Sequence, residues 1–218
     1  MNTLNKISET ANFTITTAKC GDISTLSDGV TFYMAGSGDV RIYWCGICTQ
    51  IHRLKAHNDE DLSDLYDKKY RCEYYYFGYD TSRTITISGG NITHLSCRGN
   101  EITSLLAHNC PALEMLDCGD NQLTALDVCD CPALNELDCS FNQLSATALD
   151  ALFETLRNSA DDDDNEITIH DNPGAADCNR SIAEGKDWTV IAEAKTFEEI
   201  CAEFGVILEK KCVKSYKK

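Results

Sequence analysis

Three groups of residues in this 218-residue chain have types and spacings that could do chemistry. Cys45-Gly-Ile-Cys48 has the spacing of a redox-active or zinc-binding cysteine pair. Residues 161–164 are four consecutive aspartates, a residue type that binds calcium. Asp117 and Asp138 each stand in a Leu-Asp-Cys sequence, 21 residues apart. Carboxylates held close together are tolerated by hydration, or they hold a cation or a basic side chain.

The cysteine pair lacks the partners that its chemistry needs. A thioredoxin-like site requires a strand-to-helix junction, whereas Cys45 ends a β-rich stretch. A structural zinc site needs two further ligands, and only the distant Cys72, His52 and His57 offer themselves. The favoured interpretation of Cys45 and Cys48 is a turn with buried thiols, and a metal site or a disulfide is the alternative.

The aspartate run and the hydroxyl and histidine residues fit neither a calcium-binding nor a catalytic pattern. Residues 161–164 lack the alternating ligand spacing, the central glycine and the terminal glutamate of an EF-hand, which indicates a solvated acidic loop. No G-x-S-x-G or comparable motif places a nucleophile. We therefore expect no enzyme activity, no catalytic residue, no metal and no cofactor.

The remaining carboxylate pair belongs to an internal repeat. Residues 113–121 and 134–142 both follow the pattern L-x-x-L-x-C-x-x-N, with a period of 21 residues. Residues 92–102 fit the pattern one period earlier, and residues 167–172 restore it after a 30-residue gap between asparagines. This period and these residue types are those of a leucine-rich repeat, which stacks short coils into a solenoid.

The repeat gives an inward role to its leucines, cysteines and asparagines. Because equivalent positions stack, we expect reduced core cysteines rather than disulfides, although the chain holds 13 cysteines. The asparagines are expected to form a ladder whose amides bond the backbone where it leaves each strand. The cysteines are Cys97, Cys118 and Cys139, and the asparagines are Asn100, Asn121, Asn142 and Asn172.

The side chains between these inward positions are expected to face outward on a short parallel sheet, where a partner would bind. Adjacent strands lie about 4.8 Å apart, so Asp117 and Asp138 are expected to be close enough to repel. The favoured interpretation of this pair is a hydrated row of surface charges. The candidate binding residues are His94, Ser96, Arg98, Glu114, Met115, Asp117, Glu136, Asp138, Thr168 and His170.

Antiparallel strands are expected before the repeats. Alternating and β-branched segments occur at residues 12–18, 30–35, 40–45, 72–77 and 83–88, and a Gly-Ser-Gly turn is expected at residues 35–39. This layout is that of an antiparallel β-sandwich of the immunoglobulin or PKD type.

The 30-residue gap accommodates a helix that closes the solenoid. Apolar residues from Leu149 to Leu156 recur at helical spacing, and Thr147-x-x-Asp150 forms a capping box. The chain is therefore predicted to be mainly β with some α structure. Its predicted parts are a β-sandwich at residues 1–90, a leucine-rich repeat solenoid with a helical C-terminal cap at residues 91–190, and a C-terminal helix with a basic tail at residues 191–218.

The net charge of −16 is concentrated in the repeats, because residues 92–180 hold 17 acidic residues against 3 basic ones. Such a surface repels phosphate backbones, which disfavours nucleic acid, and it favours basic partners. The chain has no apolar stretch of 18 residues and no signal-peptide pattern at its start, so neither a membrane span nor a leader is expected within it. The protein is expected to be cytoplasmic if Met1 is the native start.

In the repeats, residues 116–127, 137–145 and 167–184 resemble a group of short bacterial leucine-rich repeat proteins of the cell-surface or secreted type. The N-terminal half is similar to the β-sandwich that often precedes such repeats. The usual W-G-D-G turn is Trp44-Cys-Gly-Ile47 here, which lacks the aspartate. The resemblance implies a non-catalytic binding module, adhesin-like or host-interacting, that is exported if a leader has been removed.

Two functions are expected from these observations. In the first, the acidic outward face of the repeats binds an unknown protein or glycan, with a basic, host-derived partner as one expectation. In the second, the repeats only support the β-sandwich, which binds carbohydrate through Tyr74, Tyr75 or Tyr76.

Overall fold

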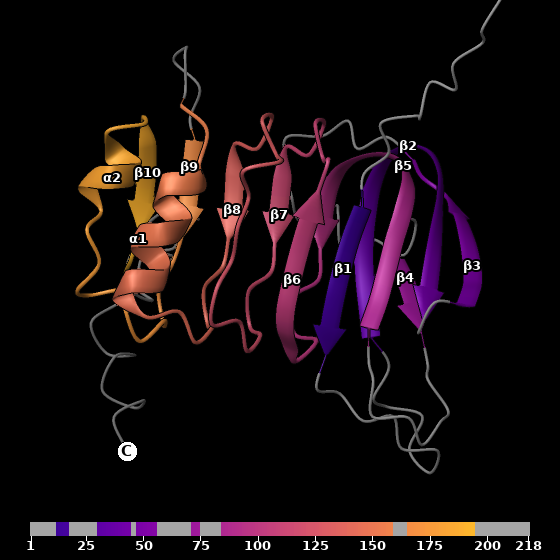
Figure 1. Ribbon diagram of the computed structural model, residues 1–218, viewed down its shortest axis with the longest axis horizontal. Helices are drawn as coiled ribbons and strands as arrows, with labels where there is room; N and C mark the ends of the chain where they lie inside the picture. The colour runs from indigo at the N-terminus through magenta and orange to yellow at the C-terminus, as the bar shows by residue number, and fades with distance from the viewer. Residues whose placement is uncertain are drawn as a thin grey trace, which may run out of the picture.

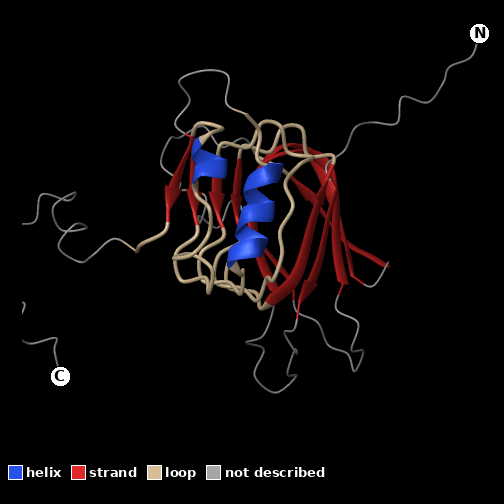
Figure 2. Cartoon of the chain, turned by 60° about the vertical axis from the view of Figure 1, so that its left-hand side comes forward, coloured by secondary structure: helices blue, strands red, loops and turns tan. Residues whose placement is uncertain are grey.

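The computed structural model describes residues 12–17, 30–44, 47–55, 71–74, 84–158 and 165–194. Within these ranges ten strands form one sheet, which curls at one end, and two helices lie beside it (Figures 1 and 2). The predicted mainly β character with some α structure is confirmed. No helix in this part of the chain is long and apolar enough to cross a membrane.

Five parallel strand segments form the repeat part of the sheet. Their order is β10, β9, β8, β7 and then β5 (Figure 1). The register places Leu95 beside Leu116, Leu116 beside Leu137, and Leu137 beside Ile167, as the 21-residue period and its 30-residue gap predict. The bounds are Thr84–Ser96 for β5, Met115–Asp117 for β7, Glu136–Asp138 for β8, Asn165–Thr168 for β9 and Trp188–Ile191 for β10.

Strand β10 extends the sheet by one strand beyond the predicted fourth coil. Val190 pairs with Ile167 of β9 in parallel, and Trp188 is buried. The predicted helical cap reaches residue 190, so its last residues form a strand of the sheet instead. The Trp-Thr-Val-Ile sequence has high β propensity, so this strand could have been predicted from the sequence.

Antiparallel strands continue the same sheet without a break. Strand β5 pairs along residues 84–88 with β1 and at residues 94–96 with β7, so one strand belongs to both parts. The expected boundary at residues 90–91 falls inside this strand. A second sheet packed face to face on the first is not among the described residues. The other strands are β1 (Asn12–Thr17), β2 (Val30–Trp44), β3 (Ile47–Arg53), β4 (Arg71–Tyr74) and β6 (Ile102–His108).

The turn predicted at residues 35–39 is wrong, because β2 runs through this segment. Its register with β5 shifts between Ala35 and Gly36 and again between Ser37 and Val40. Gly36 has a φ of 144°, and a Cβ on it would lie 2.0 Å from the carbonyl oxygen of Asn91. The glycine therefore marks a bulge where two strands approach closely, which glycine permits as readily as a turn.

Helix α1 (Ala146–Thr155) lies in the predicted gap and buries Leu149, Leu152 and Phe153. Its N-cap is Ser145, whose hydroxyl accepts a hydrogen bond from the amide of Ala148 at 3.2 Å. The predicted capping box at residues 147–150 is therefore wrong, since both of its members lie inside the helix. The short helix α2 (Ser181–Glu184) follows and packs near α1 (Figure 2).

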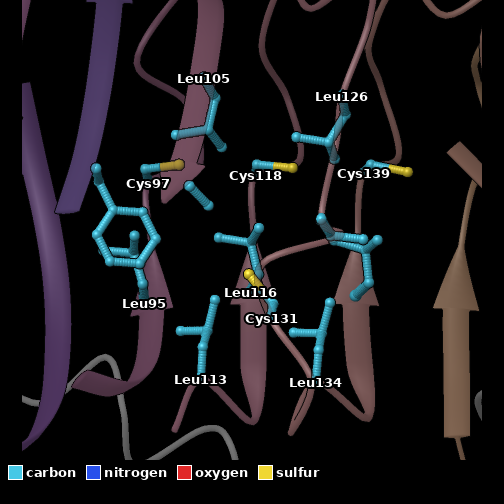
Figure 3. Close-up of a cluster of buried hydrophobic side chains, with 14 of the residues drawn as sticks. Leu95, Cys97, Leu105, Leu113, Leu116, Cys118, Leu126, Cys131, Leu134 and Cys139 are labelled. Atoms are coloured by element: carbon cyan, nitrogen blue, oxygen red, sulfur yellow. The ribbon is translucent and has the colours of Figure 1, made fainter. Parts of the chain in front are cut away.

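The apolar core is continuous from Phe13 in β1 to Trp188 in β10. Figure 3 shows its central part, where Cys97, Cys118 and Cys139 lie in one row between leucines on either side. All three are fully buried free thiols, and burial raises their pKa values. A buried thiol acts here as a small apolar side chain.

Candidate functional site

An asparagine ladder holds the coils together where the chain leaves each strand. The amide nitrogen of Asn121 donates to the carbonyls of Cys97, Cys118 and Gly119 at 3.0–3.1 Å. Its carbonyl oxygen accepts from the backbone amides of Asn100 at 3.0 Å and Ile102 at 2.9 Å. One buried side chain therefore bonds five backbone groups in two neighbouring coils.

The ladder repeats at Asn142 and Asn172 and ends differently at Asn100. Asn142 and Asn172 each donate to a cysteine carbonyl in the preceding coil, at 3.0 and 2.9 Å. Asn100 instead bonds β2, because its carbonyl oxygen accepts from the amide of Thr31 at 2.9 Å and its amide donates to the Thr31 carbonyl at 2.7 Å. The first coil is thus joined to the antiparallel strands by the same residue type.

The candidate binding residues lie in rows across β5, β7, β8 and β9. The first row places His94, Met115, Glu136 and Glu166 side by side. The second row places Ser96, Asp117, Asp138 and Thr168 side by side. Arg98, Ser140 and His170 follow the strands at the next outward position.

Arg98 forms ion pairs with both aspartates of the second row. Its Nη1 donates to Oδ2 of Asp138 at 2.7 Å and to Oδ1 of Asp117 at 3.3 Å. Burial lowers the pKa of Arg98, but the attraction of both carboxylates outweighs it, so the pKa lies above its ordinary value. The carboxylate pair could be hydrated, hold a cation or hold a basic side chain. In the described structure it holds a basic side chain of the same chain.

Gly119 makes room for this ion pair. A Cβ at Gly119 would lie 2.3 Å from Nη1 of Arg98, because the guanidinium crosses this coil to reach the next one. Asp117 also accepts from the amide of Gly119 at 3.0 Å and from the hydroxyl of Ser96 at 2.9 Å. Sequence reasoning named Arg98 as a candidate binding residue but did not connect it or Gly119 to the aspartates.

Three of the candidate side chains are buried although they face away from the leucine core. Ser96, Met115 and Asp117 are 1%, 4% and 5% exposed. Met115 packs with Ala35 and Tyr33 of β2. The β7 part of the outward face is therefore closed to direct contact with a partner.

Glu136 and Glu166 form the open part of the first row. They are direct neighbours on β8 and β9, Glu166 is exposed, and Glu136 is partly buried. Among the described residues, no side chain forms a hydrogen bond or an ion pair with either carboxylate. Burial and the like charge of Glu166 raise the pKa of Glu136 to about 7. A cation placed beside this pair would relieve that repulsion.

An aromatic contact lies at the other end of the same two strands. The rings of Phe141 and His170 meet edge to face, with centroids 5.1 Å apart. His170 Nδ1 lies 2.7 Å from a carboxylate oxygen of Asp171. Phe141 was not among the predicted binding residues, because the repeat pattern assigns no role to the residue before the asparagine.

The positions of the remaining candidate binding residues do not point to a particular ligand. Glu114 is exposed just before β7, and Thr168 is partly buried. His94 is partly buried, and its Nδ1 lies 2.9 Å from the hydroxyl of Thr93. Within the described part of the chain, no three His, Cys, Asp or Glu side chains are placed to hold a metal ion.

Several predicted features lie outside the described residues. These are Cys45, His57, Tyr75, Tyr76, the aspartates at 161–164 and the segment 195–218. The side chains of Cys48, His52, Cys72 and Tyr74 are also outside the description. The interpretations of the cysteine pair, the acidic loop and the tyrosines therefore stay predictions.

Comparison with known families supports the repeat assignment. The family model "Leucine Rich repeats (2 copies)" matches residues 90–128 and 111–154. The chain contains leucine-rich repeats. No curated protein and no solved structure matches it. Leucine-rich repeats generally mediate binding between proteins.

Proposed function

We propose that the chain is a non-catalytic recognition module that binds a basic protein through the outward face of β8 and β9. The observation that carries this proposal is the adjacent pair of Glu136 and Glu166, which has no ion-pair partner among the described residues. The repeats supply the general function, and this pair supplies the charge that a partner would complement.

The two carboxylate pairs of the sheet differ in a way that favours this location. Asp117 and Asp138 share Arg98, so their charge is partly neutralised within the chain. Glu136 and Glu166 have no basic partner among the described residues, and burial together with the like charge of Glu166 raises the pKa of Glu136. A lysine or arginine of a partner would lower that pKa again and gain binding energy in return.

The face is suited to electrostatic recognition. The surrounding region is strongly acidic, which steers basic partners towards it and raises their association rate. Such binding weakens as the salt concentration rises, because salt screens exposed charges. We extend the proposal to an exported, adhesin-like role, which rests on the resemblance of the repeats alone.

The proposal is tested by reversing the charge of the pair. Wild type and the Glu136→Arg/Glu166→Arg variant are used to capture partners from extracellular host proteins and glycans. The matched control is Glu154→Arg/Asp177→Arg, which makes the same charge change at exposed positions on α1 and in the segment before α2. The expected result is loss of the captured partner with the first variant and retention with the control.

Three results would contradict the proposal. If both variants lose the partner equally, net charge rather than this face determines binding. If neither variant loses it, the binding surface lies elsewhere on the chain. A substrate turned over by the purified chain would contradict its non-catalytic character.

A further inference from the structure

The turn after β8 carries an aromatic residue where the neighbouring coils carry small or polar ones. Phe141 precedes Asn142 of the ladder, and Gly99, Asp120 and Asp171 hold the equivalent positions. All four residues have left-handed backbone conformations, with φ values of 52°, 69°, 52° and 57° respectively. Glycine and aspartate adopt this conformation readily, whereas a bulky aromatic residue does so at a cost.

The ring of Phe141 is accessible and held in place. It is 45% exposed, and its edge-to-face contact with His170 fixes its orientation. His170 is itself held by the contact with Asp171. An exposed ring with a fixed orientation loses little conformational entropy when a partner packs on it.

The equivalent turn positions on both sides of Phe141 are carboxylates. Successive turns are joined by backbone hydrogen bonds, from Asp120 to Ser140 at 3.0 Å and from Phe141 to His170 at 3.0 Å. Asp120 and Asp171 are exposed. An aromatic ring between two carboxylates suits a lysine or arginine, because the cation contacts the negative face of the ring and both charges attract it.

Phe141 and the glutamate pair lie at opposite ends of the same two strands. Glu136 begins β8, this strand ends at Asp138, and Phe141 follows in the turn, five residues after Glu136. At a strand rise of about 3.3 Å per residue, five residues span at most roughly 16 Å, and the turn after Asp138 shortens this separation. In an extended chain, residues i and i+4 span about 13 Å, which lies within this limit, and they point to the same side.

We infer that the outward face of β8 and β9 binds an extended segment of a basic protein through two of its lysine or arginine side chains, four residues apart. One of them lies beside Glu136 and Glu166. The other packs on the ring of Phe141 between Asp120 and Asp171. This inference rests on the proposed function and adds to it the spacing and conformation of the recognised segment.

The inference is tested with two labelled peptides of equal composition and charge. Both consist of glycine and serine with two lysines, which are four residues apart in one peptide and adjacent in the other. Fluorescence anisotropy at low salt measures their affinity for the full chain. The expected result is tighter binding of the peptide with separated lysines.

Two substitutions at Phe141 separate the aromatic contact from the fold. Phe141→Asn removes the ring and suits the left-handed conformation, so the melting temperature is expected to stay the same or rise. Phe141→Leu keeps an apolar side chain without a π face. Both are expected to weaken the binding of the separated-lysine peptide about two- to thirtyfold, the range of a cation–π contact.

The outcomes distinguish this inference from the proposed function. Equal affinity for both peptides, no binding of either peptide, or unchanged affinity in Phe141→Asn overturns the inference. Retained affinity in Phe141→Leu overturns the cation–π contact and leaves an apolar one. If the inference is overturned in one of these ways but the Glu136→Arg/Glu166→Arg variant loses the protein that wild type captures, the proposed function stands without the inference.

Discussion

Replacing Asn121 with leucine removes the central member of the asparagine ladder. Leucine has a similar size but forms no hydrogen bonds, so five backbone groups lose a partner. The effects on these groups differ. The Cys97 carbonyl still accepts a hydrogen bond from the side-chain amide of Asn100 at 2.8 Å, and the Cys118 carbonyl still accepts one from the side-chain amide of Asn142 at 3.0 Å.

The cost therefore falls mainly on the two backbone amides that donate to the Asn121 carbonyl oxygen. These are the amides of Asn100 and Ile102, both in buried residues. Removing the acceptor of a buried donor costs about 1–3 kcal/mol. The Asn121→Leu variant is expected to lose about 2–6 kcal/mol of unfolding free energy, a large fraction of the stability of an ordinary domain.

Equilibrium urea unfolding followed by far-UV circular dichroism measures this loss. The matched control is Gln122→Leu, which makes the same type of replacement at the neighbouring exposed position. The control is expected to change the stability by less than about 0.5 kcal/mol. If Asn121→Leu also stays within that range, the backbone groups are satisfied without the ladder, and the reasoning is refuted.

Three further predictions follow from the site and the core. Gly119→Ala is expected to displace Arg98 and to lower the free energy of unfolding by about 0.5–1 kcal/mol, a modest loss because the ion pair is partly exposed. This loss should vanish when Arg98 is also replaced by alanine, and a loss that persists there contradicts the steric explanation. Because the folded-state pKa of Glu136 is raised to about 7, wild type should lose stability relative to Glu136→Gln as the pH rises from about 4.5 through 7. Melting temperatures measured in parallel check this, and a pH-independent difference counts against it. In the folded protein, iodoacetamide should modify the exposed Cys129 and spare the buried Cys118 until the protein unfolds, as peptide mass spectrometry can show.

Much of the repeat geometry was predictable because it depends on neighbours at a fixed separation. Once the 21-residue period is known, Leu116 must stack on Leu137, and the bonds of Asn121 reach the coil before it. The helix in the long gap was predictable from its apolar spacing, although its cap was placed two residues too late. These features depend on local sequence and on one stacking rule.

The candidate site was less predictable because its charges pair across more than one coil. Sequence reasoning brought Asp117 and Asp138 together but favoured hydration over a cation or a basic side chain, whereas the structure shows the basic side chain of Arg98. The decision depends on the reach of Arg98 across Gly119, two coils away from Asp138. The exposed ring of Phe141 was missed because it occupies a position that the repeat leaves undefined.

The sequence by itself determined the stacked coils, their inward residues and the acidic character of their outward face. Periodic burial and hydrogen bonding need only the order of residues within each coil. The tertiary structure alone decided that β5 joins the antiparallel strands to the repeats, that Met115 is covered, and that Glu136 rather than Asp117 stays open. Those outcomes arise from contacts between segments far apart in the chain, which no local pattern specifies.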